Sequence, residues 1–278
     1  MFFNVQAHNE RIAAFKDTMS RIESDSSLQQ AVAKSIASQQ FIAEGIEITL
    51  PQPPYAEPAK VVVTKNRSFE AARPYAEQGL KVAVLNFASS TNPGGGVTRG
   101  ANAQEECLCR VSTLYPCLND ASMWDVFYTP HRKAKNPLHN DDIIYTKEVV
   151  VIKDDDLQPL DKMFTVDVIT CAAPTLREET SNRYNPSEGK HVDVTPEELL
   201  ALHEKRGRLI LESAAANGVE VLILGAFGCG AFKNDPAVVA QAYANILPEY
   251  LRYFRTIEFG IYCRPRDVKN FSAFAKVL

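Results

Sequence analysis

Several features that would assign a protein early to a class are missing from this chain of 278 residues. No apolar run approaches about 18 residues, so we expect no membrane-spanning helix. The first ten residues, MFFNVQAHNE, lack the basic stretch and apolar core of a secretory signal, so we expect a cytoplasmic protein. Acidic residues outnumber basic ones by 34 to 30. Non-specific binding of duplex DNA usually needs a basic face, so we expect no such partner.

Cysteine is present, but not in the patterns that bind metal. The six cysteines include no CxxC pair, and Cys107 and Cys109 have no second pair or histidine at ligand spacing. In a cytoplasmic protein we expect them to be reduced thiols. The five histidines are scattered through polar or helical segments, and none stands out as a catalyst. The sequence therefore predicts neither a metal nor a cofactor.

The order of apolar and polar segments predicts an α/β protein. Apolar residues recur at helical spacing within residues 5–45, and four prolines between positions 51 and 58 end that segment. Beyond it, short apolar runs alternate with helical stretches, which favours one sheet with helices packed on it. We therefore expect an N-terminal helical extension, residues 1–50, packed on a core of residues 51–278, as a single domain overall.

Two apolar runs, residues 81–87 and 219–224, predict strands, and the density of the first indicates a strand buried on both faces. Each leads into a glycine-rich segment and then into a helix, the second beginning near Asp235. Because ligands of open α/β sheets lie at the carboxyl ends of the strands, both glycine-rich segments could border one cleft. Paired strands are expected at residues 143–145 and 148–152, and residues 119–142 are expected to be irregular.

The first glycine-rich segment is Asn92-Pro93-Gly94-Gly95-Gly96, followed seven residues later by Gln104-Glu105-Glu106. Successive glycines can adopt positive φ and let the backbone approach a ligand closely. The two glutamates would open a helix, where acidic side chains complement the helix dipole. A flexible loop and ordinary helix capping would explain each part alone. Their combination directly after a buried strand is much more specific.

The second glycine-rich segment, residues 225–232, has the sequence GAFGCGAF. It lacks the third glycine of a dinucleotide-binding fingerprint and the Lys-Ser/Thr of a Walker A motif, which disfavours kinase or NTPase chemistry. Its backbone N–H groups, after a strand and near a helix start, are suited to a diphosphate, and a structural turn is the alternative. Within it, Cys229 is favoured as a small filler over a nucleophile, because no base is assigned to it.

Together these segments resemble the bacterial-type poly(ADP-ribose) glycohydrolases, a branch of the macrodomain superfamily. The resemblance is carried by a GGG-x(6–8)-QEE signature at residues 94–106 and by GAFGCGAFKNDP at residues 225–236. Weaker similarity covers residues 141–145 and 168–174. The resemblance to this family implies a macrodomain-like three-layer α/β fold with a central mixed sheet. One departure is Thr175, where the family pattern has Asn, which affects a peripheral contact.

The resemblance also implies an activity, the hydrolysis of ribose–ribose O-glycosidic bonds in poly(ADP-ribose) or ADP-ribosylated proteins, with ADP-ribose as product. Glu106 maps to the catalytic acid/base, and Glu105 to the neighbouring carboxylate that holds the ribose hydroxyls. Phe232 would order the distal ribose, which Asn92 and the first glycines would hold. The implied ligand-binding residues are Asn92, Gly94, Gly95, Gly96, Gln104, Gly228, Cys229, Gly230, Ala231 and Phe232.

This assignment agrees with the chemistry of glycoside cleavage, which passes through an oxocarbenium-like state and needs a protonated leaving group. A protonated Glu106 would donate to the departing 2′-oxygen and then accept a proton from the attacking water. Since Glu105 and Glu106 are adjacent in sequence, we do not expect them to flank the bond as in most glycosidases.

Two other functions stay open. A non-enzymatic ADP-ribose reader would keep both glycine-rich segments but would not need paired glutamates, so Gln104-Glu105-Glu106 favours an enzyme. No residue separates polymer hydrolysis from the hydrolysis of mono-ADP-ribosylated protein or of O-acetyl-ADP-ribose.

Overall fold

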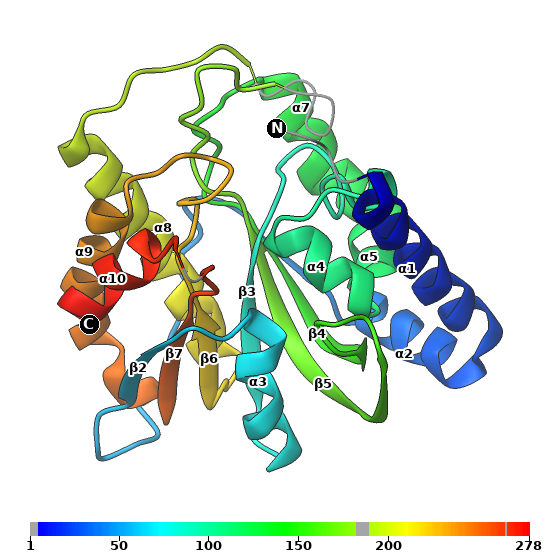
Figure 1. Ribbon diagram of the computed structural model, residues 1–278. Helices are drawn as coiled ribbons and strands as arrows, with labels where there is room; N and C mark the ends of the chain where they lie inside the picture. The colour runs from blue at the N-terminus through cyan, green and yellow to red at the C-terminus, as the bar shows by residue number, and fades with distance from the viewer. Residues whose placement is uncertain (1–4, 182–188, 265) are drawn as a thin grey trace.

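The computed structural model describes residues 5–181, 189–264 and 266–278. These residues form a seven-stranded sheet with helices on both faces (Figure 1), in the strand order β1-β4-β5-β3-β6-β7-β2. From β5 to β2 all neighbouring strands are parallel, whereas β4 and β1 run antiparallel to their neighbours. The predicted three-layer arrangement around a mixed sheet is confirmed.

The strands of this sheet are β1 (Gln40–Ile42), β2 (Lys60–Thr64), β3 (Val82–Phe87), β4 (Ile143–Lys153), β5 (Pro159–Cys171), β6 (Val221–Leu224) and β7 (Thr256–Gly260). Helices α1 (Val5–Ser24), α2 (Ser26–Ala37), α3 (Ser68–Glu77), α4 (Gln104–Val111) and α5 (Leu114–Leu118) lie on one side of the sheet. Helices α8 (Pro196–Ala216), α9 (Pro236–Ile246) and α10 (Lys269–Val277) lie on the other.

Strand β3 shows why the central strands are mostly apolar. Val82 and Val84 point into the core beneath α3 and α4. Ala83 and Leu85 point into the opposite core, with α8 and α9. Alternate side chains of a strand face opposite sides of the sheet, so a strand covered on both faces can carry apolar residues at consecutive positions, as residues 82–85 do.

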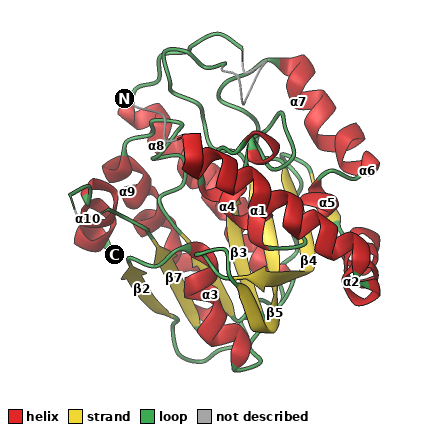
Figure 2. Cartoon of the chain, turned by 45° about the vertical axis from the view of Figure 1, so that its right-hand side comes forward, coloured by secondary structure: helices red, strands yellow, loops and turns green. Residues whose placement is uncertain are grey.

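The N-terminal segment is built differently from one long helical stretch. Asp25 interrupts it, because its carboxylate accepts hydrogen bonds from the backbone N–H groups of Ser27 and Leu28 and so starts α2. Helix α1 lies across α4 (Figure 2), where Phe15 packs into the core and Thr18 Oγ1 donates to the carbonyl of Arg110 at 2.5 Å. Strand β1 then joins the edge of the sheet.

Two expectations about the middle of the chain are wrong. The segments 143–145 and 148–152 are one strand, β4, paired with β5. A bulge at Glu148, whose φ is +53°, breaks the apolar pattern. Residues 119–142 are not irregular throughout, because α6 (Ala121–Met123), a π-helical turn (Trp124–Tyr128) and α7 (Thr129–Ala134) follow one another.

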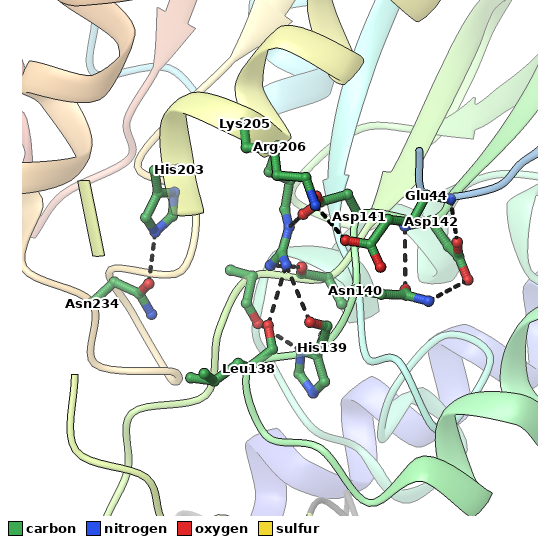
Figure 3. Close-up of polar contacts among 12 residues, drawn as sticks. Glu44, Leu138, His139, Asn140, Asp141, Asp142, His203, Lys205, Arg206 and Asn234 are labelled. Carbon is green, nitrogen blue, oxygen red and sulfur yellow. Dashed lines mark hydrogen bonds and ion pairs between the residues drawn. The ribbon is translucent and has the colours of Figure 1, made fainter. Parts of the chain in front are cut away.

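Arg206 on α8 ties this helix to the segments that enter β4 and leave β5 (Figure 3). Its side chain is 1% exposed, and its Nε donates to Asp141 Oδ1 at 2.8 Å. Its other nitrogens donate to the carbonyls of Ala172 and Leu138 at 2.6 and 3.2 Å. Burial raises the pKa of Asp141, but Arg206 and Lys205 together lower it further, so that the net pKa lies below its usual value. This buried ion pair therefore fixes helix α8 against the sheet.

Asp141→Asn should lower the free energy of unfolding by about 3–5 kcal/mol, because it leaves Arg206 buried without a counter-charge. Urea unfolding measures this loss. Since the pKa of Asp141 is depressed, the wild-type pair contributes its full stability above the ordinary pKa of an aspartate. That contribution disappears as the pH falls through the folded pKa. Asp161→Asn, at an exposed position of β5, is the control; equal stability of both variants would refute this role.

Candidate active site

A cleft of about 890 Å³ opens where β3, β6, β7 and β2 end. Its walls come from both glycine-rich segments, the start of α4, the segments after β2 and β7, and the first turns of α1. The predicted site residues that line it are Gly95, Gln104, Glu105, Glu106, Gly228, Gly230, Ala231 and Phe232. The two glycine-rich segments, far apart in sequence, therefore do border one cleft.

Gln104 joins the first residue of α4 to strand β3. Its Nε2 donates to the carbonyl of Leu85 at 2.7 Å, and its Oε1 accepts from the backbone N–H of Phe87 at 2.9 Å. Nε2 also donates to Ser68 Oγ at 3.0 Å. The amide group thus pairs with the strand as a neighbouring backbone would, and it fixes where the helix begins.

Glu105 is 3% exposed and lies beneath the cleft surface. Its Oε2 accepts from the backbone N–H of Ser89 at 2.8 Å, and its Oε1 accepts from Asn86 Nδ2 at 3.4 Å. Burial, and next the charge of Glu106, raise the pKa of Glu105 well above its usual value, against the lowering effect of these donors. The site therefore favours the protonated form of Glu105.

Glu106 bridges the two ends of the loop that precedes its helix. Its Oε1 accepts from the backbone N–H of Gly96 and its Oε2 from that of Ala103, both at 2.8 Å. A Cβ at Gly95, whose φ is +57°, would stand 2.5 Å from Glu106 Oε1 and 3.1 Å from Glu105 Oε2. The two carboxyl groups therefore converge on Gly95, and only a glycine fits between them and the cleft.

The second glycine-rich segment is held from behind by Asn234, which is 2% exposed. Its Nδ2 contacts the carbonyls of Pro174, Gly228 and Phe232 at 2.7, 3.1 and 3.3 Å. Its Oδ1 lies 2.7 Å from Nε2 of His203 (Figure 3). Because Oδ1 can only accept, His203 donates from Nε2. Burial lowers the pKa of His203 to about 4, so the imidazole is neutral. The segment after β6 is thereby fixed to the segment after β5.

Phe232 forms the cleft wall at the end of this segment. Its ring lies 5.9 Å from the ring of His139, and the guanidinium of Arg177 stands 5.4 Å from its centroid. The carbonyl of Phe232 accepts from the N–H of Leu176 at 2.8 Å. Only 9% of the residue is exposed, so Phe232 presents an edge of a packed aromatic cluster to the cleft.

Four predicted ligand-binding residues, Asn92, Gly94, Gly96 and Cys229, are not among the residues that line the cleft. Asn92 Oδ1 accepts from Arg132 Nη2 at 2.5 Å, and a Cβ at Gly94 would meet Tyr115 and Cys109. Gly96 donates to Glu106, as described above. Cys229 packs against the core, and burial raises the pKa of its thiol. This placement agrees with a small filler.

Thr175, the departure from the family pattern, is fully buried. Its backbone N–H donates to the carbonyl of Pro137 at 2.7 Å. It does not belong to the residues that line the cleft. The departure therefore leaves the cleft surface unchanged.

Sequence reasoning missed several residues that line the cleft. Arg67 and Tyr262 follow the neighbouring strands β2 and β7, and the guanidinium of Arg67 stands 4.5 Å from the ring centroid of Tyr262. Their position after parallel strands was a usable signal. Arg11 of α1 also lines the cleft and donates from Nε to the carbonyl of Gly100 at 2.7 Å. Nothing in the helical pattern of α1 indicates this contact.

Within the described residue ranges, no three His, Cys, Asp or Glu side chains are grouped so as to hold a metal ion. Over the same ranges, no helix is long and apolar enough to cross a membrane.

Residues 9–154 match the family described as microbial-type PARG, catalytic domain, where PARG stands for poly(ADP-ribose) glycohydrolase. No curated protein matches the chain at a significant level.

Solved structures resemble the chain over nearly its whole length. It is 28% identical to the poly(ADP-ribose) glycohydrolase of Thermomonospora curvata, with a TM-score of 0.82, over 97% of this chain and 100% of that one. It is 30% identical to the Deinococcus radiodurans enzyme in complex with ADP-ribose, with a TM-score of 0.73, over 89% of this chain and 96% of that one. The chain therefore belongs to the family of microbial-type poly(ADP-ribose) glycohydrolases.

Proposed function

We propose that this cleft hydrolyses the ribose–ribose bonds of poly(ADP-ribose) and that Glu106 is the acid/base. The observation that carries the proposal is the convergence of Glu105 and Glu106 on Gly95, in the same cleft as the second glycine-rich segment. A module that only binds ADP-ribose has no need for two carboxyl groups at this point. Family membership supports hydrolysis of the polymer, with ADP-ribose as the product.

The cleft suggests one orientation for an ADP-ribose unit. Its diphosphate would lie against the backbone of residues 228–231, where N–H groups follow a strand. Its distal ribose would then lie between Gly95 and Phe232. The adenine would reach the other end, where Tyr262, 55% exposed, offers an aromatic face beside Arg67.

In this orientation Glu106 donates its proton to the 2′-oxygen of the departing unit as the bond from C1″ to that oxygen breaks. The distal ribose becomes oxocarbenium-like, and the carboxylate now on Glu106 stabilises its positive charge. Water adds to C1″ and returns a proton to Glu106, which restores the acid and frees ADP-ribose. Glu105 holds a ribose hydroxyl, and this step requires the proton of the pair to be on Glu106 in the substrate complex, whereas burial favours it on Glu105 in the free site. Gln104 is a positioning residue, because its amide is already bonded to β3.

Glu106→Gln should reduce polymer hydrolysis by about two to four orders of magnitude, because an amide cannot exchange a proton with the leaving group or the water. The affinity for ADP-ribose, measured by calorimetry, should change little, since the product is bound mainly by the two glycine-rich segments. Glu23→Gln, on an exposed position of α1, is the matched control. Near-normal turnover by the Glu106 variant would show that the acid/base is assigned wrongly.

Glu105→Gln should make the free energy of unfolding less sensitive to pH. The raised pKa means that folded Glu105 keeps a proton that the unfolded chain releases. Wild-type stability should therefore fall as the pH rises from the ordinary pKa of a glutamate to the folded pKa of Glu105. Urea unfolding across that range should show the variant gaining on the wild type as the pH rises. A constant difference between the two proteins would contradict the protonated state of Glu105.

Substitutions at two glycines of the second glycine-rich segment test the strain of the loop separately from its contact with the ligand. Gly228 has φ +77°, and a Cβ there would stand 2.7 Å from Ala173 Cβ. Gly228→Ala should therefore distort the loop and weaken ADP-ribose binding about tenfold or more, together with a lower Tm. A Cβ at Gly230 meets no atom within 4 Å. Gly230→Ala should keep the Tm yet weaken binding, because the methyl group faces the diphosphate. Unchanged affinity in both variants would show that this segment is only a turn.

A further inference from the structure

The C-terminal end of α7 carries two lysines that no acidic residue of the described ranges pairs with. Lys133 and Lys135 are exposed, and neither forms an ion pair with any residue in the described part of the chain. Lys135 adopts φ +48° as the C-cap of the helix. Cations at a helix C-terminus complement the helix dipole, which explains why lysines are found at the end of a helix. It does not explain why this helix end is bonded to the loop of the active site.

Arg132 attaches this basic end directly to the active site. Its Nε donates to the carbonyl of Thr91 at 2.6 Å and its Nη2 to Asn92 Oδ1 at 2.5 Å, while its guanidinium rests on the Trp124 ring at 4.5 Å. Thr91 and Asn92 lead into the glycine loop that contacts Glu106. Helix α7 lies at the same end of the molecule as the carboxyl end of β3 (Figure 1). None of the described residues of α7 lines the cleft itself, but Lys133 and Lys135 adjoin a residue that is bonded to the loop contacting Glu106.

The cleft itself offers only a small surplus of positive charge, because Glu105 is favoured as the neutral acid. Its lining contains four arginines, Arg11, Arg67, Arg110 and Arg177, and four acidic residues, Glu10, Glu105, Glu106 and Asp155. The chain as a whole has a formal charge of −4. A polymer in which every unit carries a charged diphosphate therefore needs cations elsewhere along its path.

We infer that Lys133 and Lys135 form a subsite for the diphosphate of the polymer unit on the leaving side of the cleaved bond. This inference rests on the proposed function, which places the bond at the distal ribose. The next unit starts at that ribose, and the basic end of α7 is the exposed cationic surface bonded to the loop there. The subsite favours a polymer over a single ADP-ribose, because only a polymer extends beyond the cleft.

The test compares Lys133→Glu/Lys135→Glu with a control of equal charge change, Lys162→Glu/Lys276→Glu, both of whose lysines are exposed and lie on β5 and α10. Steady-state hydrolysis of long poly(ADP-ribose) is measured at several salt concentrations, and ADP-ribose binding is measured by calorimetry. For the α7 variant, KM for polymer should rise about tenfold at low salt, with kcat and ADP-ribose affinity unchanged. The difference from the control should shrink as salt is added.

An equal KM for polymer in both double variants would overturn the inference. It would also be overturned if the α7 variant lost affinity for ADP-ribose by the same factor by which its KM for polymer rises. The second result would mean that α7 only supports the site structurally. The wild-type protein separates these failures from a failure of the proposed function. If it binds ADP-ribose but does not hydrolyse the polymer, the proposed function itself is wrong.

Discussion

Three consecutive side chains at the start of α4 bind backbone groups, and the geometry of the cleft depends on these bonds. Gln104 pairs with β3, Glu105 accepts from Ser89, and Glu106 closes the loop between Gly96 and Ala103. The same bonds that shape the loop aim two carboxyl groups at one point. Burial and mutual repulsion then favour a proton on Glu105. The shape of the loop and the placement of the two carboxyl groups therefore both depend on one turn of helix.

Much of this could be predicted from the sequence, because the relevant signals are local. Strand β3 is apolar from Val82 to Leu85 because both of its faces are covered, and helix α8 begins where Thr195, Pro196 and Glu198 form a capping box. The glycine-rich segments follow strands and precede helices, so their meeting in one cleft follows from the rule for parallel sheets. The paired glutamates could be identified because they lie at a fixed, short spacing after the first of these segments.

Contacts between distant segments left no comparable signal. The bulge at Glu148 lets one strand look like two, and the helical turns of residues 121–134 are too short for periodicity to show. Asn234 is an ordinary residue in the sequence, yet it holds three carbonyls from two segments. Arg11 reaches the cleft only because α1 packs across α4. Such roles depend on the tertiary arrangement, which residue spacing along the chain does not contain.

The central claim is that the cleft binds one ADP-ribose unit with its distal ribose at the two glutamates. A crystal structure of the chain with ADP-ribose tests it most directly. The account predicts the diphosphate against the backbone of residues 228–231, the distal ribose within hydrogen-bond reach of Glu105 and Glu106, and the adenine near Tyr262. A ligand bound in the opposite direction, with its adenine at Gly95 and its distal ribose at Tyr262, would contradict the assigned mechanism.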